Sequence, residues 1–533
     1  MVDEMRLATL PRTPFRAITV DCKHHFRITE PGNLLPSRGL RKNLTMIRNT
    51  WTLLSRFVFF LLLVALTSTA ASAQTVPDVD KDTAFRWLDA NAETMRNMSA
   101  KIWSAAETSL HEYKSSRELM AFLESNGLRV EKGIAGMPTA FVASYGSGKP
   151  VVAIYGEYDA LAGLSQKAEA AISPVLAGAP GHGCGHNLQA SSAAAAVALA
   201  KWMQAKQVAG TLRFYGTPAE ESLGGKNYMS EAGTFDDVDV LLGWHSMNTT
   251  RTGFDYSKAV ASVRFKFKGV AAHASVAPQL GRCALKGVEL LDIGVNFMRE
   301  HLEEDARVHS VITDGGGQPN VVPASAESWY YIRANKHQDV AKMFDWISEI
   351  AKGAAMMTRT EVQITVDDDS HQLLPNRPLA EIMQRNLDRV GAPKFTDEEK
   401  GTAQQMQKSL KTSPQLALPE QIEPLPDKPG QGLFSTDLGN VSWKVPSTIL
   451  YVASYPYGVP IHSWQVTACS GMSIGHKAMT VGAKTLTGTV IDLFRHPELI
   501  GAAKKDLQER KKNYAFRLLT PPNRKPPIVQ ESQ

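Results

Sequence analysis

The sequence predicts an α/β protein, with a mixed sheet covered by helices on both faces and a smaller inserted α+β domain. Short apolar runs alternate with helical stretches from about residue 82, and near Ser257 the pattern changes to strict polar–apolar alternation. The length of 533 residues allows two or three domains. Hydrophobic residues at 43% and charged residues at 21% are ordinary for a globular protein. The small net charge of +5 gives no reason to expect a nucleic-acid partner.

The segment that begins at Met46 has the features of a secretory signal peptide. Two arginines precede the apolar run 57–66, and small residues end the segment at Ala73. The run is short for a membrane span, so we expect cleavage after Ala73 and no stable membrane anchor. The protein is then exported, periplasmic or secreted, and its mature form starts at Gln74. Residues 1–45 precede this signal and show no periodicity, so we interpret them as the product of a start codon assigned too early.

Three cysteines would remain after cleavage, namely Cys184, Cys283 and Cys469. An odd number argues against a disulfide framework in an oxidising compartment. A thiol that stays free there needs burial or a metal to protect it, and this favours a ligand role for Cys184.

The first part of the chain is predicted to be α/β. Residues 84–125 show helical spacing, with Gly127 as a stop, and 190–206 form an alanine-rich helix. Four apolar runs bounded by Gly, Pro or charged residues are expected as buried strands of a mixed sheet, namely 140–144, 151–155, 211–215 and 238–244.

The part after Ser257 is predicted to be two helices over a small antiparallel sheet. The strands are expected at 260–268, 308–313, 328–332 and 361–366, and the helices at 284–300 and 337–357. Residues 395–432, rich in Gln, Lys, Pro and Glu, are expected as an exposed loop or insertion. A strand at 447–452, a helix within 471–494 and a terminal helix with a loosely held end complete the chain. The predicted divisions are 1–45, the signal 46–73, the catalytic domain in two parts at 80–256 and 369–500, the inserted lid or dimerisation domain at 257–368, and the tail 501–533.

The segment Gly-His-Gly-Cys-Gly-His-Asn at 181–187 is the strongest chemical signal. Glycines allow tight turns, so Cys184 and His186 can point the same way from one loop and bind a metal. The alternative is that both are ordinary buried residues.

Polar groups at the ends of other predicted strands support the metal hypothesis. Asp159 follows one strand, the Glu220-Glu221 pair follows another, His245 closes a third, and His462 lies in a later loop. Each of these alone is more commonly structural. Strand ends of one sheet can converge on a single crevice, and a thiolate, three imidazoles and a carboxylate would suit two closely spaced divalent cations. One carboxylate is left over to take a proton from water. His182, His371 and His476 lack such placement and are expected to be structural.

The ordered motifs Gly-Glu-Tyr-Asp-Ala-Leu, Gly-His-Gly-Cys-Gly-His-Asn, Thr-Pro-Ala-Glu-Glu, Trp-His and His-Ser-Trp resemble one known family. They are similar to the amidohydrolase branch of the dinuclear zinc peptidases that include aminoacylases and glutamate carboxypeptidases, over about residues 80–500. The resemblance implies hydrolysis of the amide bond of an N-acyl or N-aroyl amino acid by a metal-activated water.

The resemblance also implies a role for each matching residue. Cys184 would bridge two divalent ions, Zn or Mn, and Glu220 would be the general base. His273 in the inserted domain would reach the active site of a neighbouring subunit, so a homodimer or heterodimer through that domain is expected. The other implied roles are metal ligands for His186, Glu221, His245 and His462, ligand orientation for Asp159, and substrate contact for Asn320.

One departure from the wider family lies two residues before Asp159. Peptidases of that family have a His there, whereas this chain has Glu157, so His186 would have to fill that coordination role. The departure favours an amidohydrolase over a general peptidase. Two alternatives stay open: Cys184 as a thiol nucleophile with His186 as its base, and a non-catalytic exported binding protein.

Overall fold

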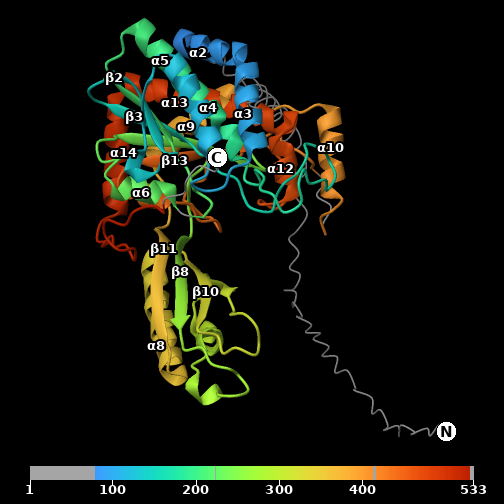
Figure 1. Ribbon diagram of the computed structural model, residues 1–533. Coiled ribbons are helices and arrows are strands. Elements are labelled where there is room, and N and C mark those ends of the chain that lie inside the picture. The colour runs from blue at the N-terminus through green and yellow to red at the C-terminus, as the bar shows by residue number, and fades with distance from the viewer. Residues whose placement is uncertain (1–77, 223, 412–415, 528–533) are drawn as a thin grey trace, which may run out of the picture. The chain divides into compact units, whose positions relative to one another are not determined.

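The computed structural model describes residues 78–222, 224–411 and 416–527 (Figure 1). The predicted signal peptide at 46–73 and the segment 1–45 lie outside these residues. The described part has the predicted α/β class, with a large mixed sheet and a separate smaller sheet.

The large sheet has seven strands in the order β1-β2-β4-β3-β5-β13-β6. Its four central strands β4, β3, β5 and β13 run parallel, while β1, β2 and β6 pair antiparallel at the two edges. Apolar runs form the centre because parallel strands are covered on both faces. The strands are Arg129–Lys132 (β1), Phe141–Ser147 (β2), Val151–Gly156 (β3), Gly210–Gly216 (β4), Val240–Met247 (β5), Arg251–Thr252 (β6) and Ser447–Ala453 (β13).

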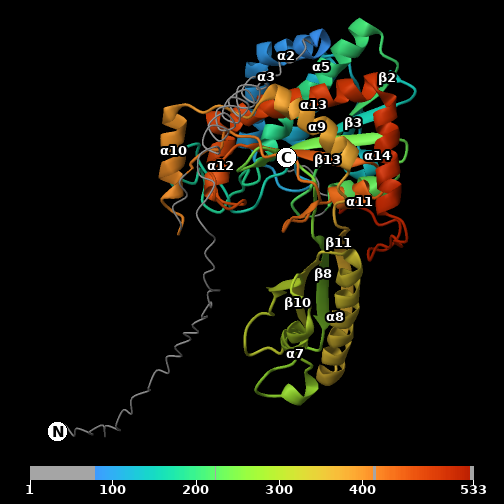
Figure 2. The same ribbon diagram turned by 180° about the vertical axis from the view of Figure 1, so that it is seen from behind.

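Helices cover both faces of this sheet (Figures 1 and 2). Ala190–Lys206 (α5) and Ser473–Arg495 (α13) pack together and against the central strands on one face. Gly225–Glu231 (α6) and Leu438–Ser442 (α11) pack on the other. The small side chains of α5 let it lie close to its neighbours, which explains why the alanine-rich segment is buried along most of its length.

The stretch expected to be helical at 84–125 consists of three helices. They are Val79–Ala90 (α2), Ala92–Ala105 (α3) and Tyr113–Ser125 (α4). Ala106 adopts a left-handed conformation and ends α3, and a loop follows up to Glu112. This loop was not predicted, and it contributes to the site described below.

The inserted segment folds as two helices on a four-stranded antiparallel sheet of order β11-β8-β10-β9. Its elements lie where the alternation predicted them, and β10 alternates between half-buried and buried positions along its whole length. They are Ala259–Lys268 (β8), Ala284–Met298 (α7), Arg307–Asp314 (β9), Ser325–Ala334 (β10), His337–Thr358 (α8) and Glu361–Ser370 (β11). A separate apolar core lies between the sheet and the two helices.

The prediction of a loop at 395–432 is wrong for its first part. Residues Asp397–Gln407 form a helix (α10), with a capping box between Thr396 and Glu399. Ala403 and Met406 are its buried apolar residues, and this sparse apolar stripe hid the helix in a polar sequence. The remaining elements are Arg377–Val390 (α9), Trp464–Ser470 (α12), Pro497–Arg510 (α14) and the short parallel pair Asp255–Tyr256 (β7) with Gly430–Gln431 (β12).

Cys184, Cys283 and Cys469 are all unpaired. Across the described ranges, none of the helices is both long and apolar enough to cross a bilayer.

Candidate metal centre

The residues that end the central strands meet at one edge of the large sheet. Asp159 follows β3, the Glu220-Glu221 pair follows β4, and His245 lies near the end of β5. The loop before α5 supplies Cys184 and His186, and the loop after β13 supplies His462. Carboxyl ends of parallel strands lie at the same edge, and this topology brings together residues that are up to 303 positions apart.

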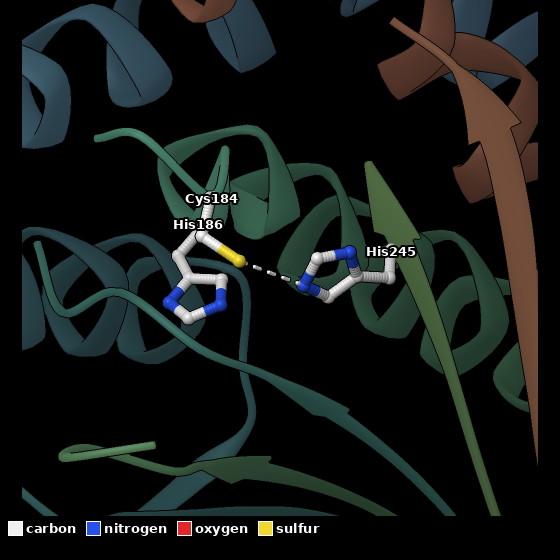
Figure 3. Close-up of side chains that lie close together, drawn as sticks. All are labelled: Cys184, His186 and His245. Carbon is white, nitrogen blue, oxygen red and sulfur yellow. Dashed lines mark hydrogen bonds between the residues drawn. The ribbon is translucent and has the colours of Figure 1, made fainter. Parts of the chain in front are cut away.

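Two sets of possible metal ligands share one thiol. Ligand atoms of Cys184, His186 and His245 all lie within 4.8 Å of one another, and so do those of Cys184, Glu221 and His462. The Sγ atom of Cys184 is 3.4 Å from Nε2 of His245 (Figure 3). In the second set, Nε2 of His462 is 3.4 Å from Oε2 of Glu221. The structure therefore places Cys184 between two candidate ligand sets.

The histidine rings are oriented for coordination through Nε2. Nδ1 of His245 lies 2.7 Å from the carbonyl oxygen of Ser246. Nδ1 of His186 lies 3.0 Å from a carboxylate oxygen of Asp159 and 3.1 Å from the carbonyl oxygen of the same residue. These partners are acceptors, so each Nδ1 carries the hydrogen and each Nε2 presents a lone pair.

Two buried atoms of the centre lack hydrogen-bond partners. They are Nε2 of His186 and Oε1 of Glu221. Buried polar atoms are nearly always paired, because leaving them unpaired costs about 1–3 kcal/mol. The donor set of thiol, imidazole and carboxylate therefore fits a divalent metal, which would satisfy both atoms.

Asp159 connects the two ligand sets. Its Oδ1 orients His186, and its Oδ2 accepts the backbone N–H of Glu221 at 2.9 Å and the hydroxyl of Ser109 at 3.2 Å. A single buried carboxylate thus positions one candidate ligand from each side.

The glycine-rich loop depends on close backbone approach. Gly185 has φ +78°, and a Cβ atom there would lie 2.7 Å from the side chain of Ser246. His462, which also has positive φ, donates its backbone N–H to the carbonyl of Gly183 at 3.0 Å. The glycines therefore allow two distant loops to pack against each other, with Cys184 and His186 facing inward.

The turn that carries the glutamate pair rests on a buried residue that sequence reasoning missed. Oε1 of Glu112 accepts the backbone N–H of Ala219 at 2.9 Å, and its Oε2 accepts the hydroxyl of Thr139 at 2.9 Å. Ala219 has φ +61°, an unusual conformation for a residue with a side chain. Burial, together with the nearby charge of Asp159, raises the pKa of Glu112 to about 8. Glu112 lies in the unpredicted loop before α4, and nothing in its sequence context indicated this role.

Next to Glu220 is a second buried group that sequence reasoning missed. Nζ of Lys226, on α6, is 2.6 Å from Oε1 of Glu157 and 2.6 Å from Oδ1 of Asp437. Burial by itself would raise the pKa of Glu157, but the nearby charges of Lys226 and His186 together have the larger effect. The pKa of Glu157 is therefore lowered to about 2. Burial raises the pKa of Asp437 to about 6, although Lys226 opposes the shift. Nothing in the local sequence distinguishes a buried lysine from an exposed one, so Lys226 could not have been identified in advance.

Glu220 faces a cavity of about 560 Å³ together with Cys184, Glu221, His245 and His462. Burial raises the pKa of Glu220 well above its usual range, and the neighbouring carboxylates of Glu157 and Glu221 add to the shift. Excess negative charge of this kind in a buried site favours bound cations.

Aromatic and aliphatic side chains form much of the remaining cavity wall, including Tyr155, Tyr451, Phe434, Ile449 and Tyr455. The inserted domain contributes Arg333 at the end of β10, whose guanidinium donates to the hydroxyl of Ser435 at 2.9 Å. Burial lowers the pKa of Arg333. Arg333 is another functional candidate that the sequence did not indicate.

His273 and Asn320 do not belong to this cavity. Both are exposed, and they lie beside each other, since Ala274 donates its N–H to the carbonyl of Asn320 at 2.9 Å. They are next to the end of β8 and the start of β10, whereas Ser262 and Arg333 line the cavity from the other ends of these strands. A ten-residue strand such as β8 is about 33 Å long. Within one chain these two residues are therefore far from the candidate metal ligands.

The three histidines expected to be structural lie outside both ligand sets. Nε2 of His182 is 3.0 Å from the carbonyl of Ile102. His371 is stacked between His337 and Phe516, with ring centroids 3.7 and 4.0 Å apart. His476 lies on α13.

Known proteins are similar to this chain in sequence and in fold. Residues 153–418 match the model of peptidase family M20/M25/M40. One of the subunits of p-aminobenzoyl-glutamate hydrolase from Escherichia coli is 39% identical over 451 residues, which cover 79% of this chain and 93% of that protein. The Xaa-Arg dipeptidase of Mus musculus is 27% identical, over 83% of this chain and 94% of that protein.

Solved structures show the same fold at lower identity. An aminobenzoyl-glutamate utilization protein from Klebsiella pneumoniae matches with a TM-score of 0.53 and 18% identity, over 76% of this chain and 97% of that one. A dinuclear metal-binding M20 peptidase from Bacillus subtilis matches with a TM-score of 0.51 and 17% identity, over 76% of this chain and 99% of that one. The fold, the ordered motifs and the extent of the sequence match agree, and the chain belongs to peptidase family M20/M25/M40.

Proposed function

We propose that this protein is a dinuclear metal-dependent amidohydrolase that cleaves the amide bond of N-acyl or N-aroyl amino acids. The observation that carries the proposal is the pair of ligand sets that share Cys184. A shared thiolate would bridge two ions, with His186 and His245 on one side and Glu221 and His462 on the other. The identity of the E. coli relative, which belongs to an aminobenzoyl-glutamate hydrolase, supports this substrate class.

The cavity suits a substrate with an apolar acyl group and a carboxylate. Tyr155, Tyr451 and Phe434 offer apolar surface for an acyl or aroyl group. Arg333 is a half-buried guanidinium that pairs with a hydroxyl, which leaves donors for a carboxylate. A neutral aromatic amide without a carboxylate would use only half of these features.

Glu220 is positioned to move the proton. Two bound divalent ions would lower the pKa of a water and polarise the substrate carbonyl. The carboxylate of Glu220, beside both ligand sets, accepts the proton of the attacking water and then protonates the leaving amine. His273, supplied by another subunit, would donate a hydrogen bond to the oxyanion. Asn320 lies next to His273 and would contact the same substrate.

Removal and return of metal test the proposal directly. We expect chelated protein to lose turnover of a panel of N-acyl and N-aroyl amino acids, and Zn or Mn to restore it. Elemental analysis of the same samples should give two metal ions per chain. Turnover that survives complete metal removal would instead support Cys184 as a thiol nucleophile. Absence of turnover in fully loaded protein would support the binding-protein alternative.

Metal identity, assembly and location are part of the same proposal. Thiolate and imidazole ligands suit Zn, and carboxylates also suit Mn. The position of His273 far from its own chain's ligand sets supports a homodimer or heterodimer through the inserted domain. The features of residues 46–73 support export, and N-terminal sequencing of the mature protein would test it by finding Gln74 first.

A further inference from the structure

Arg524 is a buried arginine near the C-terminus that the proposed mechanism does not use. It belongs to the residues that follow α14, and its side chain is only 8% exposed. An arginine is almost never buried this deeply without partners, because the removal of its charge from water is costly. The partners of Arg524 therefore show which parts of the fold the C-terminal residues hold together.

The guanidinium of Arg524 joins the helix α6 to the strand β11. Its Nε lies 3.1 Å from Oε1 of Glu231 at the end of α6, and its Cζ lies 4.0 Å from the ring centroid of Tyr228 on the same helix. On β11, the guanidinium donates to the backbone carbonyl of Asp367 and lies 3.6 Å from a carboxylate oxygen of Asp368. One buried side chain thus binds an element of the catalytic domain and the last strand of the inserted domain.

The helix α6 and the strand β11 also meet directly. Nδ2 of Asn227, on α6, lies 2.8 Å from Oδ1 of Asp368 and 2.7 Å from Oγ of Ser370. A Cβ atom at Gly224, just before α6, would lie 2.1 Å from Oδ1 of Asp368, so only a glycine fits there. Arg524 therefore reinforces a junction at which the segment after the glutamate pair already contacts β11.

The position of β11 determines where Arg333 lies. Val260 on β8 is in register with Ser370 on β11 and with Arg333 on β10. The three residues form one row across the end of the inserted sheet, and all of them line the cavity. Domains move as rigid bodies about their hinges, so a shift of β11 along α6 would move Arg333 relative to Glu220.

We propose that Arg524 is a positioning residue for substrate recognition. By holding β11 against α6, it fixes the separation between Arg333, which would bind the substrate carboxylate, and Glu220, beside which the amide would be cleaved. The inference rests on the proposed function. A fixed separation favours one spacing between carboxylate and amide, so the C-terminal residues would help to select the length of the amino-acid part of the substrate.

The test compares Arg524→Gln with Arg517→Gln. Both substitutions remove one positive charge from the residues after α14, but Arg517 is exposed. We expect Arg524→Gln to raise KM for carboxylate substrates by about 5-fold or more, because a displaced binding group loses much of its contribution. Arg517→Gln should leave KM unchanged. Neither substitution should change KM for substrates whose carboxylate is converted to an amide.

The spacing preference gives a second readout that a purely structural role would not change. N-acyl β-amino acids have one more methylene between amide and carboxylate than N-acyl α-amino acids. We expect the ratio of kcat/KM for these two substrate types to move toward one in Arg524→Gln and to stay at the wild-type value in Arg517→Gln. A ratio that is the same in wild type and Arg524→Gln would contradict the proposed selection by length.

A double substitution shows whether Arg524 acts through Arg333. The KM of the double variant Arg524→Gln/Arg333→Met should equal that of Arg333→Met alone, since no carboxylate partner is left to position. Additive effects, or an equal effect of Arg524→Gln on the carboxylate and amide substrates, would overturn the inference.

Arg524→Lys keeps the charge but loses the planar donor fork, and it replaces Arg524→Gln if that variant does not fold. Its KM for carboxylate substrates should also rise above the wild-type value, and an unchanged KM would count against the inference. Absence of turnover by metal-loaded wild-type protein would refute the proposed function instead.

Discussion

Single side chains in this centre have separable chemical tasks. Asp159, Ser246 and Gly185 position candidate ligands, whereas Glu220 belongs to neither candidate set that shares Cys184 and faces the cavity. A substitution of Glu220 therefore changes proton transfer and leaves the shared thiolate and its imidazoles in place.

We expect Glu220→Gln to keep both metals and to lower kcat by about 10²–10⁴-fold, the usual contribution of a general acid–base group. The amide has nearly the same shape but cannot accept the proton. Steady-state kinetics with elemental analysis on one sample would check this. Turnover near the wild-type rate would show that another group is the base.

Substrate recognition can be tested separately at Arg333. Arg333→Met should raise KM by about 10–100-fold, because a charge-assisted hydrogen bond contributes about 1.5–3 kcal/mol. The KM of Arg333→Lys should lie between those of the wild type and Arg333→Met, since a lysine keeps the charge but loses the bidentate geometry. Substrates whose carboxylate is converted to an amide serve as the control, and the effect on KM should largely vanish for them. An equal effect on both substrate forms would contradict carboxylate recognition.

At the scale of elements, the loop before α5 and the C-terminal residues that follow α14 each make a close contact that can be tested by one substitution. Both contacts join segments that are distant in sequence, Gly185 with Ser246 and His371 with Phe516. The two can be disturbed individually.

Gly185→Ala should destabilise the protein and reduce its metal content. The matched control is Gly163→Ala, where φ is +76° but no atom lies within 4 Å of the added Cβ. The control should lose about 1–2 kcal/mol from left-handed strain alone. Gly185→Ala should lose more, because its Cβ also meets Ser246, and should displace Cys184 and His186. Thermal unfolding and metal analysis check both variants, and identical behaviour would contradict the contact.

His371 links the C-terminal residues to stability at acid pH. Burial, with a contribution from His337, lowers its pKa to about 2. The folded state therefore holds this imidazole neutral, whereas the unfolded chain takes up a proton below about pH 6.5. Its contribution to stability is complete above that pH and declines as the pH falls toward 2.

The substitution His371→Phe retains stacking against Phe516 and removes the titration. We expect the Tm of the wild type to fall more than the Tm of the variant as the pH is lowered from 7 to 5, with both proteins in the same metal buffer. A difference in Tm that stays constant over this range would show that His371 is not responsible.

At the scale of the whole molecule, the proposed role of His273 requires a second chain. His273 lies at the end of the inserted sheet opposite to the end that carries Arg333. A second chain can bring His273 and Asn320 to a metal centre that their own chain cannot reach. A monomer would then lack part of the machinery.

Mixing two inactive variants tests this arrangement. Glu220→Gln and His273→Ala should each be nearly inactive, and subunit exchange between them should restore activity. Mixed dimers contain one complete site, formed by Glu220 of one chain and His273 of the other. Activity of the mixture that does not exceed the sum of the separate variants would contradict a shared site.

The sequence by itself determined the fold class and predicted the candidate metal ligands. Short continuous apolar runs predicted the central strands, because each buried strand must be apolar on both faces. The residues at the ends of these strands or in the turns beside them included Cys184, His186, Glu221, His245 and His462. Local spacing was sufficient for this part, since periodicity is a property of neighbouring residues.

Only the tertiary structure decided which groups that are distant in sequence form ion pairs and pack together. Lys226 joins Glu157 to Asp437 across 280 positions, and Glu112 supports Ala219 from an unpredicted loop. Such pairings depend on long-range contacts that carry no periodic signal. The physical reason is that a buried charge must find its counter-ion wherever the chain folds, so the packing of the sheet edge, and not the local sequence, selects the partner.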